Sequence, residues 1–258
     1  MALTEGWKNT IKSAEGNAAW DAHDAIIIKV VKEFNDHQSE LKKNNYFKEG
    51  IEIKRLPPYI IKMMCWVETG AGIQKWNTNP MQIGAYKADP AMDVVLKGKE
   101  GTSLILPDKY KTGKTNALTA DKIQGTPLYN IVTAVCYLIA RFAKTEMINY
   151  QTSTTLKTDK LQARESLSSA AKRLKTDVDT LQRESGITDQ DITRLRPGRE
   201  LKYYPTQKRL VISGWHGEFT NTKLIAKRYN GGGDSDYETK LNFVKDSIIK
   251  RSNYNSLR

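Results

Sequence analysis

One carboxylate in this chain stands at the end of an almost wholly apolar stretch. Glu68 follows Met63-Met64-Cys65-Trp66-Val67, and residues 60–67 leave almost no polar face if they form a helix. A helix that is apolar nearly all round is typical of a protein centre, and burial there disfavours the ionised form of a carboxylic acid. The pattern therefore predicts a glutamic acid that stays protonated near neutral pH and can act as a general acid. The position of Glu68, taken alone, agrees at least as well with an ordinary glutamate at a helix end whose side chain reaches solvent.

Four short motifs, beginning with Glu68, follow one another along the chain. They are Glu68-Thr69, Asn79-Pro80-Met81-Gln82-Ile83, Asn130-Ile131 with Tyr137-Leu138, and Ala226-Lys227-Arg228-Tyr229-Asn230-Gly231-Gly232-Gly233. This order resembles the soluble lytic transglycosylase and goose-type lysozyme superfamily. The resemblance implies a lysozyme-like helical domain that cleaves the β-1,4 bond between N-acetylmuramic acid and N-acetylglucosamine in peptidoglycan, without a metal or cofactor.

The same resemblance assigns roles to individual residues. Glu68 would protonate the glycosidic oxygen, and Tyr229 would place its hydroxyl near that carboxyl group. Thr69 would supply a hydroxyl that orients Glu68. The remaining substrate-binding positions would be Asn79 and Gln82 in the groove, Met81 packed beneath their loop, and Asn230 on a neighbouring loop or on a sugar amide.

A second carboxylate decides how the bond is broken. Glycoside hydrolysis normally uses two carboxyl groups, whereas a lytic transglycosylase uses one glutamate as acid and then as base while the muramyl 6-hydroxyl closes an anhydro ring. Goose-type lysozymes have an aspartate just after the Met-Gln pair, where this chain has Ile83-Gly84. That difference favours transglycosylase chemistry, but Asp89 and Asp93 follow closely enough to serve a hydrolytic muramidase.

Residues 152–204 differ in character from the segments on either side and look like an inserted module. Their pattern predicts a strand over 154–159, helices over 166–174 and 178–184, and a strand over 200–204. The segment resembles a LysM domain, a module that binds N-acetylglucosamine units, which implies glycan binding beside the catalytic groove. The family's usual Gly-Asp and asparagine are replaced by Ala163-Arg164 and Ser185, so a spacer role stays open.

The rest of the chain is expected to form one helical domain from residues 1–151 and 205–258. Apolar residues at helical spacing predict helices over 20–41, from Pro58 onward, over 127–147 and over 237–248. Residues 70–128 are expected to be long loops with one small helix or hairpin near 92–106. The predicted fold class is mainly α (α+β).

Charge and composition limit the classes of partner. The chain has 258 residues, with 41 Lys and Arg against 29 Asp and Glu, so its formal net charge is +12. Such charge suits polyanions, among which we expect peptidoglycan; the sequence shows no nucleic-acid-binding motif. No apolar run is long enough for a membrane span. Cys65 and Cys136 lie in apolar runs and are expected to be free thiols, with one disulfide as the alternative.

The N-terminal residues do not resemble a Sec signal peptide. We therefore expect a protein made in the cytoplasm that acts on the cell wall in the periplasm as an antibacterial effector, delivered by a type VI secretion or phage-tail-like carrier and neutralised by a cognate immunity protein. A non-catalytic wall-binding protein is the rival from another class.

Overall fold

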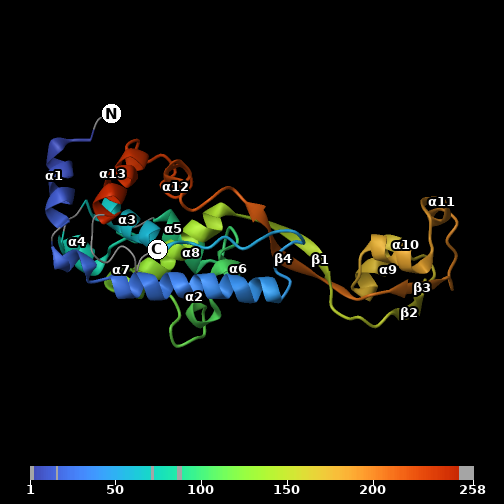
Figure 1. Cartoon of the computed structure of the whole chain (residues 1–258). Coiled ribbons are helices and arrows are strands. Elements are labelled where there is room, and N and C mark those ends of the chain that lie inside the picture. Colours follow the sequence, from blue (N-terminus) through green and yellow to red (C-terminus); the bar gives the residue numbers. More distant parts are fainter. Residues whose placement is uncertain (1–2, 16, 71–72, 86–88, 250–258) are drawn as a thin grey trace. The chain divides into compact units, whose positions relative to one another are not determined.

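The computed structural model describes residues 3–15, 17–70, 73–85 and 89–249 (Figure 1). The chain forms two compact units: unit 1 consists of Met1–Thr145 and Ile212–Arg258, and unit 2 of Glu146–Val211. Unit 2 begins at 146 rather than 152 and ends at 211 rather than 204, because the chain enters and leaves it through two strands that pair with each other, β1 (Ala143–Gln151) and β4 (Thr206–Trp215).

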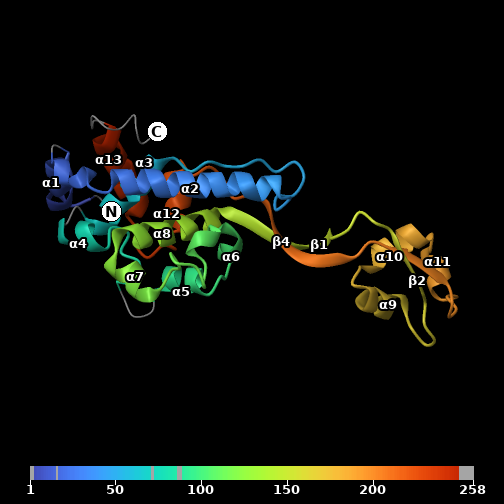
Figure 2. The same cartoon turned by 90° about the horizontal axis from the view of Figure 1, so that it is seen from below.

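Unit 1 is mainly helical, as predicted. Its longer helices are α1 (Glu5–Ala14), α2 (Asp24–Lys43), α3 (Pro58–Thr69), α8 (Pro127–Phe142) and α13 (Tyr237–Ile249). Its shorter elements are η1 (Ala18–Asp21), α4 (Ile73–Thr78), α5 (Pro90–Leu96), α6 (Thr102–Ile105), η2 (Asp108–Tyr110), α7 (Ala120–Gly125) and α12 (Thr222–Arg228). Figures 1 and 2 show α2 alongside α8, and α3 packs against both α2 and α13.

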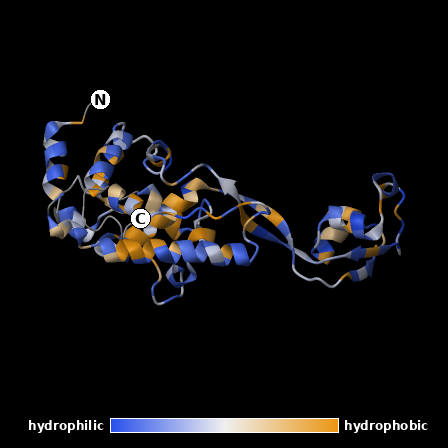
Figure 3. Cartoon of the chain, in the orientation of Figure 1, coloured by the Kyte–Doolittle hydropathy of each residue, from blue (hydrophilic) through white to orange (hydrophobic). Residues whose placement is uncertain are grey.

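Helix α3 forms where the sequence predicts a buried helix. Pro58 occupies its first turn, where the missing N–H is not needed, and Gly70 ends it in the left-handed conformation at φ 57°. Lys62 is fully buried on this helix, and its Nζ lies 2.7 Å from both Asp21 Oδ1 and Asp24 Oδ2. Two carboxylates thereby compensate the buried ammonium group. Apolar residues gather where α2, α3 and α8 meet (Figure 3).

Two expectations for unit 1 were wrong. The helix predicted over 127–147 ends at Phe142, because the residues that follow pair with β4 as strand β1. The segment 70–128, predicted as loops with one small helix or hairpin near 92–106, has α5 and α6 close to that place but also contains α4, α7 and η2. Several of these are too short for a hydrophobic period to show, and they depend on caps such as Asp89 for α5 and Thr119 for α7.

Unit 2 has the predicted strand–helix–helix–strand order. Strands β2 (Lys157–Lys160) and β3 (Glu200–Tyr203) are antiparallel, with Lys157 opposite Tyr203. Helices α9 (Leu167–Leu174) and α10 (Val178–Ser185) lie between them in the chain, with a further turn, α11 (Asp189–Ile192). Its own small core contains Leu161, Leu167, Ala170, Ala171, Leu174, Leu181, Ile187, Leu201 and Tyr203.

Both cysteines are buried and free, which confirms the predicted thiols. Among the described residues, no helix combines the length and the apolar character that a membrane crossing requires.

Candidate active site

Glu68 lies on the last turn of α3, half-buried, and faces the start of α13. The Tyr237 hydroxyl donates a hydrogen bond of 2.7 Å to Glu68 Oε1. Burial, followed by the charge of Glu68, raises the pKa of Tyr237 well above its usual range, so this phenol keeps its proton and acts as the donor. A carboxyl oxygen of Glu68 is therefore held by a buried, neutral partner that is remote in sequence.

Burial raises the pKa of Glu68 from 4.5 to about 7. The Tyr237 hydrogen bond opposes this rise, while the negative charges of Asp234 and Asp89 add to it and the charge of Lys240 lowers it. Lys240 Nζ lies 2.6 Å from Asp234 Oδ2, which limits the influence of both charges. The result agrees with the sequence prediction that Glu68 is a carboxylic acid able to give up a proton near neutral pH.

A cavity of about 240 Å³ opens beside Glu68. It brings together six of the residues singled out from the sequence, namely Glu68, Met81, Gln82, Asp89, Tyr229 and Asn230. Ile83, Pro90, Ala91 and Tyr137 complete its lining. Three other predicted site residues, Thr69, Asn79 and Asp93, are not part of this lining.

The loop at residues 79–84 is held from below by α8. Asn130 is fully buried; its Oδ1 accepts from the Met81 backbone N–H at 2.8 Å and its Nδ2 donates to the Ile83 carbonyl at 3.0 Å. Met81 packs beneath the loop as expected, with its sulfur 3.2 Å from Cys65 Sγ. Gln82 takes a left-handed backbone conformation at φ 53°, which a non-glycine residue rarely adopts.

Asn79 shapes this loop from within. Its side-chain Nδ2 donates to the Ile83 carbonyl at 3.1 Å, and its own carbonyl accepts from Gln82 Nε2 at 2.8 Å. These bonds close the turn that presents Gln82 to the cavity. Asn79 is thus a positioning residue for the loop: its Nδ2 is engaged by the Ile83 carbonyl, its Oδ1 is buried without a partner, and it is not part of the cavity lining. A direct role in substrate binding stays a prediction.

Thr69 does not orient Glu68 by donating to it. The Thr69 hydroxyl donates to the Cys65 carbonyl one turn earlier on α3, at 2.9 Å, and Thr69 is buried. This is the common back-bonding of a threonine inside a helix. The orienting hydroxyl comes from Tyr237 instead.

The two candidate second carboxylates lie in different surroundings. Asp89 lines the cavity, but its oxygens accept from the backbone N–H groups of Gly84, Ala91 and Met92, and it caps α5. Asp93 lies on the exposed side of α5 and pairs with Lys97 and Lys99. The prediction for Asp93 is therefore corrected: one turn into the helix, its side chain is directed to surface lysines rather than to Glu68.

Tyr229 and Asn230 both reach the cavity from the end of α12. The Tyr229 ring packs edge-on against Tyr137 at 5.6 Å between centroids, and burial, then the charge of Glu68, raises its pKa. Asn230 Nδ2 donates to the Asp234 carbonyl at 3.2 Å, so it also fixes the segment that leads to α13.

Sequence reasoning missed Tyr237 and Asp234 as members of the site. Tyr237 is 2% exposed and was expected on the apolar face of the last helix, where it lies. The only available signal was a phenol at the start of that helix, shortly after three glycines and an aspartate. Its partner is 169 residues away in sequence, which no local pattern encodes.

Of the replaced positions of unit 2, Ser185 has a structural role. Ser185 Oγ accepts from the Lys202 backbone N–H at 2.8 Å and donates to the Lys202 carbonyl at 3.2 Å, which joins α10 to β3. Arg164 takes a left-handed conformation at φ 62° before α9.

Within the ranges that the structure describes, no three histidine, cysteine or acidic side chains gather in a way that could hold a metal ion. Comparison with known proteins found no matching family model, no matching curated protein and no matching solved structure.

Proposed function

We propose that the protein cleaves peptidoglycan glycan strands at the bond between N-acetylmuramic acid and N-acetylglucosamine, with Glu68 as general acid. The observation that supports this most is the placement of Glu68, which lines a cavity, is bonded to the buried Tyr237 hydroxyl and has its pKa raised to about 7 by burial. A carboxylic acid tuned close to the working pH is suited to proton transfer in both directions. The ordered motifs around Glu68, Gln82 and Tyr229 indicate which substrate it serves, through their resemblance to lytic transglycosylases.

In the proposed reaction, Glu68 gives its proton to the glycosidic oxygen while the bond from that oxygen to C1 of the muramyl sugar breaks. The Glu68 carboxylate then takes the proton of the muramyl 6-hydroxyl, whose oxygen bonds to C1. The products are a free sugar hydroxyl and a 1,6-anhydromuramyl end, and Glu68 is again protonated. Tyr237 holds one Glu68 oxygen throughout, which leaves the other carboxyl oxygen for the proton.

Hydrolysis by a muramidase is the second candidate, because Asp89 lines the same cavity. In that reaction a water molecule supplies the oxygen that bonds to C1, and the product has a reducing end. The three backbone N–H groups that bind Asp89 favour its capping role over the positioning of water. The transglycosylase outcome needs no second carboxylate and is therefore preferred.

We assign the protein to antibacterial effectors on the arrangement of a glycosidase interrupted by a LysM-like module. A secretion-device carrier and an immunity protein are then its expected partners. Affinity purification of the Glu68→Gln variant from producing cells tests this role. Recovery of neither a carrier component nor an inhibitory protein would argue against it.

The enzymatic proposal is tested by mass spectrometry of soluble products from purified peptidoglycan. Wild type, Glu68→Gln and the control Glu49→Gln are compared, since Glu49 is an exposed carboxylate of unit 1 outside the cavity. We expect anhydromuramyl products from wild type and the control, and none from Glu68→Gln. Reducing ends would establish a muramidase, and no Glu68-dependent product would leave a wall-binding protein.

A further inference from the structure

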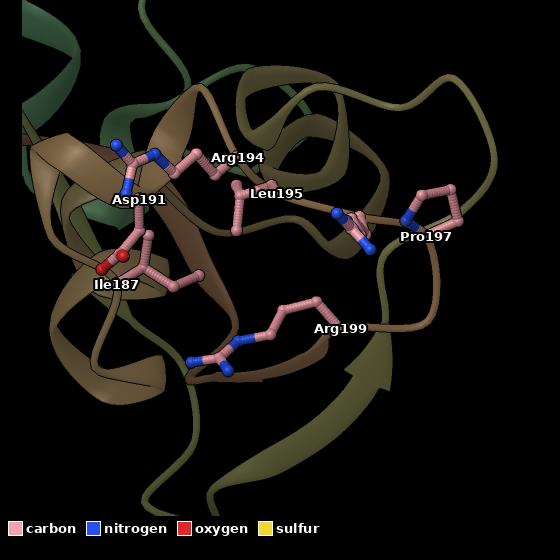
Figure 4. Close-up of a pocket in the computed structure, with 7 residues that line it drawn as sticks. Ile187, Asp191, Arg194, Leu195, Pro197 and Arg199 are labelled. Atoms are coloured by element: carbon pink, nitrogen blue, oxygen red, sulfur yellow. The ribbon is translucent and has the colours of Figure 1, made fainter.

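Unit 2 contains a hollow of about 350 Å³ in the segment between α10 and β3. Its lining consists of Ile187, Asp191, Arg194, Leu195, Arg196, Pro197 and Arg199 (Figure 4). In Figure 4 the Arg194 and Arg199 side chains border the hollow on two sides, with Ile187 between them. The hollow therefore combines three apolar side chains with three arginines and one aspartate.

The lining has three guanidinium groups against one carboxylate, so its net charge is positive. Asp191 is the one acid of the lining, and its Oδ2 accepts from the Thr188 hydroxyl at 2.6 Å and the Thr188 N–H at 2.9 Å. These bonds, assisted by the charges of Arg199 and Arg194, lower the pKa of Asp191. In the part of the chain that the structure describes, no carboxylate lies within ion-pair distance of the three lining guanidinium groups.

Another arginine of unit 2 forms ion pairs with carboxylates of its own unit. Arg173 is paired with Asp159 at 3.0 Å and with Glu165 at 2.8 Å. Among the lining arginines, Arg199 donates one bond to the Ser185 carbonyl at 3.3 Å. Three exposed arginines that line one hollow, with a single carboxylate among them, are suited to bind anionic groups from outside.

We propose that this hollow binds the carboxylate groups of an acidic peptide. Guanidinium groups pair with carboxylates through two parallel hydrogen bonds, and the apolar side chains of Ile187, Leu195 and Pro197 offer contact to the aliphatic part of a peptide. Its volume falls in the range of small-ligand pockets. A nucleic acid fits less well, because single strands are normally bound by aromatic stacking and the seven lining residues include no aromatic ring.

Which acidic peptide is bound rests on the proposed function. In peptidoglycan, the stem peptides attached to N-acetylmuramic acid carry free carboxylates. Unit 2 would then select glycan strands that still bear their peptides, a specificity beyond the sugar recognition implied by the LysM resemblance.

The test is calorimetric titration of the full chain in the Glu68→Gln background, which prevents turnover. The probes are a disaccharide-tetrapeptide from peptidoglycan, the same disaccharide without peptide, and a short single-stranded DNA. One variant replaces Arg194, Arg196 and Arg199 by glutamine. The matched control replaces three exposed lysines of the same unit by glutamine, Lys157, Lys160 and Lys172. They lie outside the hollow, and the loss of charge is identical to that in the arginine variant.

We expect the arginine variant to bind the disaccharide-tetrapeptide at least about tenfold more weakly, and the lysine control to change its affinity less than about twofold. Replacing the three arginines by lysine should give an intermediate affinity, since charge is kept but paired hydrogen bonding is lost; this variant also serves if the glutamine variant does not fold. Equal binding of the peptide-free disaccharide would overturn the proposal. So would an equal loss in the lysine control, or arginine-dependent binding of DNA alone. Failure of the proposed cleavage is seen separately, as absence of Glu68-dependent products, and leaves this binding result standing.

Discussion

Replacing Glu68 by glutamine should change how the stability of unit 1 depends on pH. The pKa of Glu68 is about 7 in the folded protein against 4.5 for the ordinary carboxyl group. Between these values the native state binds more protons than the unfolded state, so the free energy of unfolding falls as pH rises through this window. Over the interval from 4.5 to about 7, at about 1.4 kcal/mol per pH unit, the loss is about 3 kcal/mol.

Glutamine stays neutral and can still accept from Tyr237, so it removes this loss without emptying the site. We expect wild type and Glu68→Gln to be similarly stable near pH 5, and the variant to be more stable by up to about 3 kcal/mol near pH 9. Urea unfolding followed by tryptophan fluorescence measures this difference in the stability of unit 1. All 5 tryptophans, Trp7, Trp20, Trp66, Trp76 and Trp215, belong to unit 1.

The control for this experiment is Glu49→Gln, which removes an exposed carboxylate from unit 1. Its stability should follow wild type at every pH. If the stability difference between wild type and Glu68→Gln stays constant from about pH 5 to about pH 9, Glu68 has no raised pKa in the folded state. The reasoning that makes it a general acid would then be refuted.

Three further outcomes follow from the same geometry. Tyr237→Phe removes a hydrogen bond to the ionised carboxylate, so the pKa of Glu68 rises further. The alkaline limb of the pH profile of kcat/KM should then move up by as much as about one pH unit. An unchanged limb would argue against this hydrogen bond. Asp89→Asn keeps the two cap bonds at Oδ1, so its cleavage rate should stay within about threefold of wild type. The exposed Asp93→Asn, the control, should behave in the same way. A loss of about a hundredfold for Asp89→Asn alone would favour the muramidase. Burial raises the pKa of both Cys65 and Cys136, so neither thiol should react with a maleimide in the native protein, while both react in urea; mass spectrometry after brief labelling would reveal a mistaken burial.

The elements that the sequence predicts well are those with a strong local pattern. Helix α3 follows from an apolar run between Pro58 and Gly70, and its end places Glu68 at the edge of the core. Helices α9 and α10 likewise begin directly after Ser166 and Asp177, whose side chains cap them. Such signals lie within a few residues of the element they define, so one sequence is sufficient to find them.

The short helices between α3 and α8 are missed because they lack a strong local pattern. Helix α5 has seven residues, too few to display a period, and it depends on Asp89. The same aspartate was considered as a second carboxylate, because its residue type is visible in the sequence while its hydrogen bonds are not. Strand β1 is missed because an extended segment becomes a strand only when β4 pairs with it.

By itself, the sequence determined a mainly helical chain, an inserted βααβ segment and the location of Glu68 at the end of a buried helix. Only the tertiary structure decided what surrounds that carboxyl group. The packing of α13 on α3 brings Tyr237 to Glu68 and Asp234 within electrostatic reach of it, and α5 carries Asp93 away. Local periodicity reports which face of a helix is buried, whereas the partners of a side chain depend on which remote elements pack beside it.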